Sequence, residues 1–133
     1  MPKIFLLNKP FGVVSQFSGN IPAETLASFI DQKGYYPAGR LDKDSEGLLI
    51  LTNDGRLQSQ ITNPRFKLGK TYLAQVENEI SPEAIALLQQ GILLNDGLTK
   101  PAIINRICDP TNIWSRTPPI RERKSITTSW IRI

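Results

Sequence analysis

The stretch PAGRLDKDSEGLLILTNDG, residues 37–55, joins a charged loop to an apolar run and a turn. The apolar run at 48–52 is shorter than most helices and is followed at once by the turn sequence NDG, so we expect a buried β-strand that ends in a turn. Three carboxylates precede this strand beside Arg40, at alternate positions: Asp42, Asp44 and Glu46. Because alternate residues of an extended chain project to the same side, we expect these side chains to converge.

Three interpretations of this acidic loop stay open on the residues alone. The loop imitates the opening of an EF-hand calcium site, but the twelfth position, which needs a bidentate glutamate, is Asn53. In a second interpretation the carboxylates are solvated turn acids that pair with Arg40 or Lys43. In the third, Asp42 is a catalytic carboxylate at the mouth of the buried strand, and Arg40 keeps it ionised and oriented.

The composition narrows the chemistry that the chain can perform. It has no histidine and one cysteine, Cys108, which excludes the usual zinc and copper ligand sets, a histidine-based catalytic triad and an internal disulfide. Any acid, base or nucleophile must therefore be a carboxylate, Tyr, Lys, Ser or Cys108. We expect no metal site.

The charge of the chain favours a polyanionic partner. Sixteen basic residues against twelve acidic residues give a net charge of +4, and most of the excess lies in the second half of the chain. Four basic residues surround the single Glu122 there: Arg116, Arg121, Arg123 and Lys124. We interpret this run first as a solvated loop, with a phosphate-binding strip as the sharper alternative.

Length and hydropathy indicate one globular domain, 1–133. The chain of 133 residues is 40% hydrophobic and 21% charged, which is typical of a soluble protein. No apolar run approaches the roughly 20 residues that span a bilayer, and the start lacks the pattern of a signal peptide. We therefore expect a cytoplasmic protein without a membrane partner.

Short strands and helices are expected along the whole chain. Strands are predicted at 5–7, 13–17, 48–52, 70–76, 92–94, 103–107 and 125–133. Helices are predicted from Thr25 to near Gly34, around Leu57 and Ile61 up to Pro64, and from Ser81 to Gly91. This order of elements indicates a mixed α+β domain.

The charged loop and strand at 37–55 resemble the signature of the bacterial ribosomal-RNA pseudouridine synthases. The likeness continues in the family's order through three further blocks: Leu7-Asn8-Lys9-Pro10 with Gly12-Val13, Lys70-Thr71-Tyr72, and Leu94-x-Asp96-Gly97 followed by Lys100-Pro101-Ala102. Four separated blocks are a specific signal, whereas GRLD alone would be a weak one. The resemblance implies the catalytic fold of this family, with a mixed, largely antiparallel sheet and short flanking helices.

The resemblance also implies an isomerase that acts on a uridine of ribosomal RNA, in the large subunit. The base is flipped out, cleaved from its ribose, turned and rejoined through a ring carbon, so no cofactor is expected. Asp42 maps onto the family aspartate, which either attacks the anomeric carbon or removes a sugar proton. Tyr72 matches a tyrosine that lies against the target base, and Arg40 matches an arginine that occupies or braces the vacated space.

Lys9 and Lys70 complete the set of residues expected to bind the RNA. Lys9 is assigned to a phosphate contact, with a surface turn lysine as its alternative. For Tyr72 the alternative is ordinary half-buried packing, and for Arg40 it is a salt bridge to a nearby acid. A non-catalytic RNA-binding domain of the same fold is the alternative for the whole chain.

The last residues depart from the family pattern. In relatives the strand that begins with Ser129-Trp130-Ile131 leads into an arginine-rich segment, which supplies a partner for the catalytic aspartate. We therefore expect an N-terminal fragment of the catalytic domain that is weakly active or inactive alone and lacks a separate N-terminal RNA-binding module. Because strand 125–133 would leave an open apolar sheet edge, we also expect self-association through it.

Overall fold

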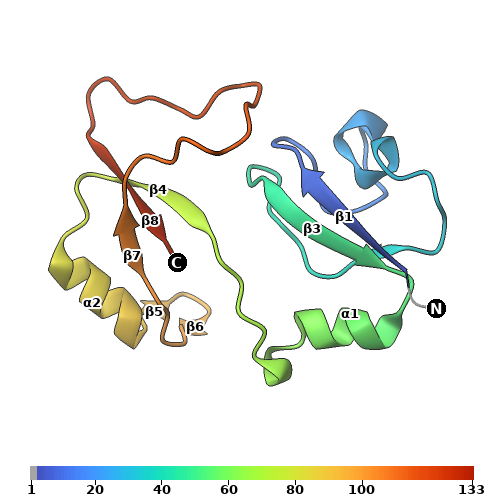
Figure 1. The fold of residues 1–133 in the computed structure, drawn as a ribbon, viewed down its shortest axis with the longest axis horizontal. Coiled ribbons are helices and arrows are strands. Elements are labelled where there is room, and N and C mark those ends of the chain that lie inside the picture. The colour runs from blue at the N-terminus through green and yellow to red at the C-terminus, as the bar shows by residue number, and fades with distance from the viewer. Residues whose placement is uncertain (1–2) are drawn as a thin grey trace. The chain divides into compact units, whose positions relative to one another are not determined.

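The computed structural model describes residues 3–133 and divides the chain into two compact units, Met1–Gly69 and Lys70–Ile133 (Figure 1). The first unit contains β1 (Ile4–Lys9), β2 (Tyr36–Pro37), β3 (Gly47–Thr52), α1 (Gly55–Thr62) and the 3₁₀ turns Pro22–Glu24, Leu26–Ser28 and Pro64–Phe66. The second unit contains β4 (Leu73–Glu77), α2 (Pro82–Gln90), β5 (Leu93–Leu94), β6 (Gly97–Leu98), β7 (Asn105–Ile107) and β8 (Thr128–Arg132).

The strand predicted at 48–52 is the middle strand of the first unit. β3 pairs with β1 on one side and β2 on the other, and both pairings are antiparallel. Leu49 and Leu51 are 3% and 0% exposed, whereas Leu48 is 62% exposed, so β3 buries one face and not both. The core beneath that face contains Val13, Leu26, Ile30, Tyr35, Leu49 and Leu51.

Residues 13–35 cover this sheet face in an irregular path. The strand predicted at 13–17 is wrong, because the amides and carbonyls of this segment bond to residues 24–26 and not to a sheet: Val14 N donates to Glu24 O at 2.9 Å and Leu26 N to Gln16 O at 2.9 Å. The helix predicted after Thr25 is reduced to the turn Leu26–Ser28, although Thr25 caps it as expected by accepting from Ala27 N. Burial of the apolar side chains decides this path, not local propensity.

The other two predicted helices are confirmed, and both have side-chain caps. In α1 the carboxylate of Asp54 accepts from the amides of Arg56 and Leu57. In α2 the hydroxyl of Ser81 accepts from Ala84 N at 3.1 Å, and the helix ends at Gly91 with a φ of 103°. The position of Gly91 also excludes a side chain, because an added Cβ would lie 2.5 Å from Thr99 O.

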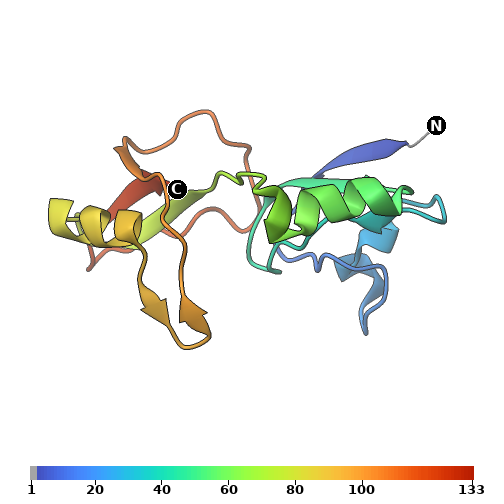
Figure 2. The same ribbon diagram turned by 90° about the horizontal axis from the view of Figure 1, so that it is seen from below.

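The second unit has a three-stranded sheet in the order β4-β8-β7, and β5 and β6 form a separate hairpin that projects from it (Figure 2). All of its strand pairs are antiparallel. The predicted α+β class with largely antiparallel strands is confirmed. No helix within residues 3–133 has the length and hydropathy that a membrane span requires.

The expectation of an open sheet edge at 125–133 is wrong. β8 lies in the middle of its sheet, with β4 and β7 paired on its two sides. Ile131 is 3% exposed and Ser129 is also buried. Because the backbone of this strand is already paired on both sides, β8 offers no free edge for self-association.

We predict that Leu51→Ala lowers the free energy of unfolding by about 2–5 kcal/mol, because it leaves a cavity beneath β3. Leu48→Ala on the exposed face of the same strand should change it by no more than about 0.5 kcal/mol. Urea denaturation followed by circular dichroism measures both. Equal losses for the two variants would contradict the assignment of the buried face.

Candidate active site

The loop at 40–46 connects β2 to β3, and its backbone is tied to the segment that follows β1. The hydroxyl of Ser15 donates to Leu41 O at 2.8 Å and accepts from Leu41 N at 3.0 Å. Gly12 N donates to Lys43 O at 2.8 Å. Ser15 is 6% exposed, so its hydrogen bonds face little competition from water. The backbone is therefore held on both sides of Asp42 by residues from outside the loop.

A turn within the loop separates the three carboxylates. Ser45 N donates to Asp42 O at 3.0 Å, so residues 42–45 do not form the extended chain on which the expected convergence depended. Within residues 3–133, no three acidic or cysteine side chains gather closely enough to hold a metal ion. The calcium interpretation therefore draws no support from the geometry.

The side chains of Asp42 and Arg40 are both exposed. In the described part of the chain neither takes part in an ion pair, so the expected pairing of Arg40 with Asp42 is not observed. Lys43 binds Glu24 at 2.7 Å, and not a carboxylate of its own loop. In water an exposed pair gains little from contact, and the carboxylate of Asp42 is left accessible to a ligand.

Lys9 lies at the end of β1 and is fully buried. Its ammonium donates to Pro10 O at 2.9 Å and to Val13 O at 2.7 Å. This position departs from both sequence interpretations, the phosphate contact and the surface turn lysine, because the side chain turns inward to carbonyls of the following loop. Burial lowers the pKa of Lys9, while the nearby carboxylates of Glu46, Asp42 and Asp44 act in the opposite direction.

The ammonium of Lys9 is therefore a buried positive charge near the carboxylates of the 40–46 loop. Its charge interacts with the carboxylates of Glu46, Asp42 and Asp44. The structure brings Lys9 and Asp42 together, with Arg40 exposed on the same loop.

The other two predicted residues, Tyr72 and Lys70, belong to the second unit. Tyr72 extends the pairing of β4 with β8, since its amide donates to Ile133 O at 2.7 Å and its carbonyl accepts from Ile133 N at 3.0 Å. Its side chain is 46% exposed, so the ring is accessible for stacking. Lys70 is exposed as well.

Ser15 is a residue of this site that sequence reasoning missed. It stands in an apolar segment, 13–17, without a neighbouring polar motif, and its partner Leu41 lies 26 positions away. Only the tertiary fold brings the two together. The one signal in the sequence was a small polar residue among apolar neighbours, which is common in half-buried segments.

Several known proteins are similar to this chain. The model of a protein family described as RNA pseudouridylate synthase matches residues 3–125. Ribosomal large subunit pseudouridine synthase E of Vibrio vulnificus is 48% identical over 98% of this chain and 56% of its own length. The protein of that name in Xanthomonas campestris pv. campestris is 49% identical over 98% of this chain and 71% of its own. The family resemblance stated from the motifs is confirmed.

A more distant relative and a solved structure extend the comparison. Ribosomal small subunit pseudouridine synthase A of Salmonella typhimurium is 37% identical over 80% of this chain and 48% of its own length. The crystal structure of a pseudouridylate synthase matches with a TM-score of 0.70 and 30% identity, covering 100% of this chain and 51% of that one. This chain thus spans about half the length of these two proteins.

We predict that Ser15→Ala speeds hydrogen exchange at the amide of Leu41 and costs about 1–3 kcal/mol of stability, because the amide and carbonyl of Leu41 lose their partner. Amide exchange followed by NMR resolves this position. Ser45→Ala is the matched control, since its hydroxyl makes no hydrogen bond within residues 3–133. Unchanged protection of Leu41 in Ser15→Ala would show that the hydroxyl does not hold the loop.

We predict that Lys9→Met lowers the free energy of unfolding by about 1–3 kcal/mol. The methionine fills similar space and relieves a buried charge, but it leaves two carbonyls without a donor, and the lost hydrogen bonds outweigh the relief of the charge. Lys43→Met removes an exposed lysine and should cost less than about 1 kcal/mol. If chemical denaturation found Lys9→Met as stable as the parent chain, the buried ammonium would have no structural role.

Proposed function

Because this chain belongs to the RNA pseudouridylate synthase family, we propose that it converts a uridine of large-subunit ribosomal RNA to pseudouridine. The names of the relatives that are 48% and 49% identical support the large subunit as the source of the RNA. The reaction cleaves the bond between uracil and ribose and remakes it to a ring carbon. Nothing is gained or lost, so the proposed chemistry requires neither a cofactor nor a metal. As ribosomal RNA is the substrate, we place the reaction in the cytoplasm.

Asp42 is the carboxylate that we propose reacts with the sugar of the target uridine. The observation that carries this proposal is that Asp42 is exposed, forms no ion pair within residues 3–133, and lies on a loop whose backbone is held by Ser15 and Gly12. A carboxylate that acts as nucleophile or base must be ionised and must be accessible to the sugar. The ammonium of Lys9 is buried against carbonyls, so its charge attracts the carboxylate of Asp42 without covering it.

The remaining residues are proposed to handle the RNA. Arg40 is exposed and free of ion pairs in the described chain, which suits a guanidinium that fills the space left by the flipped base. Tyr72 is proposed to stack on that base, and Lys70 to contact phosphate. Lys9 is proposed to hold the segment after β1 through its hydrogen bonds to Pro10 and Val13, and not to bind RNA directly. We further propose that both units form parts of one catalytic domain, since the matching crystal structure covers all of this chain.

We predict that Asp42→Asn lowers turnover by at least about a hundredfold, because an amide can neither attack the sugar nor accept its proton. The assay is tritium release from large-subunit ribosomal RNA labelled at carbon 5 of uracil. Asp44→Asn removes the same charge from an exposed position two residues away and should leave the rate nearly unchanged.

Two outcomes would overturn the proposal. Tritium release by Asp42→Asn at the rate of the parent chain would exclude Asp42 from the chemistry. RNA binding by the parent chain without any release would instead support a non-catalytic RNA-binding domain.

A further inference from the structure

The segment 108–127, which connects β7 to β8, is a long loop without regular secondary structure (Figure 1). Loops of this length within compact units commonly have a binding function. Within residues 116–124 it carries four basic side chains against one acidic side chain. It also presents Trp114, which is 67% exposed although the side chain is large and apolar.

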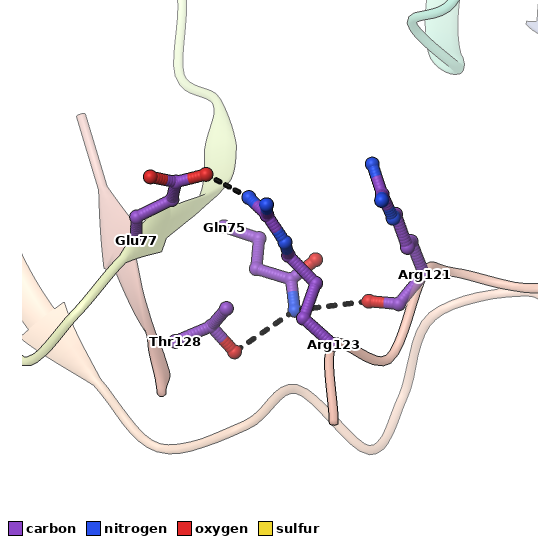
Figure 3. A network of polar contacts seen from close by, with 5 residues as sticks. All are labelled: Gln75, Glu77, Arg121, Arg123 and Thr128. Atoms are coloured by element: carbon purple, nitrogen blue, oxygen red, sulfur yellow. Dashed lines mark hydrogen bonds and ion pairs between the residues drawn. The ribbon is translucent and has the colours of Figure 1, made fainter. Parts of the chain in front are cut away.

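Two of the four basic residues stabilise the loop itself. Arg123 forms an ion pair with Glu77 of β4 (Figure 3), and its side chain is only 28% exposed. Arg116 donates to Pro119 O within the loop and is partly buried. Gln75 of β4 adds a hydrogen bond to Thr128 at the start of β8, at 3.1 Å. The C-terminal part of the loop is thus anchored on the sheet.

The other two basic residues, Arg121 and Lys124, are exposed. Neither takes part in an ion pair among residues 3–133. The main-chain carbonyl of Arg121 accepts from Gln75 at 3.5 Å, and its guanidinium extends away from the network of Figure 3. Both positive charges therefore stand on an anchored backbone with no acid neutralising them. That arrangement suits an anionic partner and lowers the entropy lost on binding.

We propose that the 108–127 loop binds RNA, with Arg121 and Lys124 contacting phosphates and Trp114 stacking on an unpaired base. This inference rests on the proposed function, which makes RNA the polyanion that the chain meets. Exposed aromatic rings beside cations are the recurring means of holding single-stranded RNA, because every base has a face for stacking and every nucleotide a phosphate. The loop is expected to hold RNA without selecting its sequence.

The test measures the affinity of the chain for a fluorescein-labelled single-stranded RNA over a range of salt concentrations by fluorescence anisotropy. The double variant Arg121→Ala with Lys124→Ala should weaken binding and reduce the slope of log affinity against log salt by about 0.7 per lost phosphate contact. The control is Arg56→Ala with Lys33→Ala, which removes the same charge from exposed positions outside the loop. The control pair should retain most of the slope.

Trp114→Ala should weaken binding roughly 5- to 150-fold, with a slope close to that of the parent chain. Trp114→Phe keeps a stacking ring and should recover most of the affinity. If the loop variants bind RNA as tightly as the parent chain, or no more weakly than the control pair, the loop inference is overturned.

Tritium release measured on the same proteins separates this inference from the proposed function. Loop variants that lose release at low RNA concentration and regain it at saturating RNA support both. A parent chain that releases no tritium, with loop variants that still lose affinity, would refute the proposed isomerase and leave the RNA-binding loop standing.

Discussion

One buried hydroxyl determines where the candidate catalytic loop lies. Ser15 bonds to both main-chain groups of Leu41, and it does so from a segment that itself covers the core of the first unit. Burial of Ser15 makes these bonds costly to break, because its hydroxyl is shielded from water. The side chain of Asp42, which we propose reacts with the sugar, is thereby left exposed on a backbone that is held in place. Preorganisation of this kind is what a carboxylate needs to meet a sugar at a defined position.

The charged groups near Asp42 also leave its carboxylate accessible. The ammonium of Lys9 is enclosed by carbonyls and acts on Asp42 through space, whereas Arg40 stays in solvent without a partner in the described chain. A direct ion pair would hold Asp42 ionised but would also cover it. The buried ammonium of Lys9 attracts the same carboxylate and leaves it open to substrate.

The sequence predicted those elements that depend on residues close to one another in the chain. The NDG turn, the Ser81-Pro82 start and the Gly91 stop act within a few residues, and β3, α1 and α2 were found where they predicted. The path of 13–17, the inward turn of Lys9 and the bond from Ser15 to Leu41 depend on partners supplied by the tertiary fold. The family resemblance predicted Asp42 as the catalytic residue but did not predict that Ser15 and Gly12 hold its loop.

Because β8 is the middle strand of its sheet, the two sheets can form one after the other during translation. Every strand pair of the first unit joins residues no later than Thr52, so its sheet is complete early in translation. The second sheet must wait, because Leu73 pairs with Arg132 and Asn105 pairs with the same residue. Until β8 leaves the ribosome, β4 and β7 have no common partner, so the sheet of the first unit can form while that of the second unit is still incomplete.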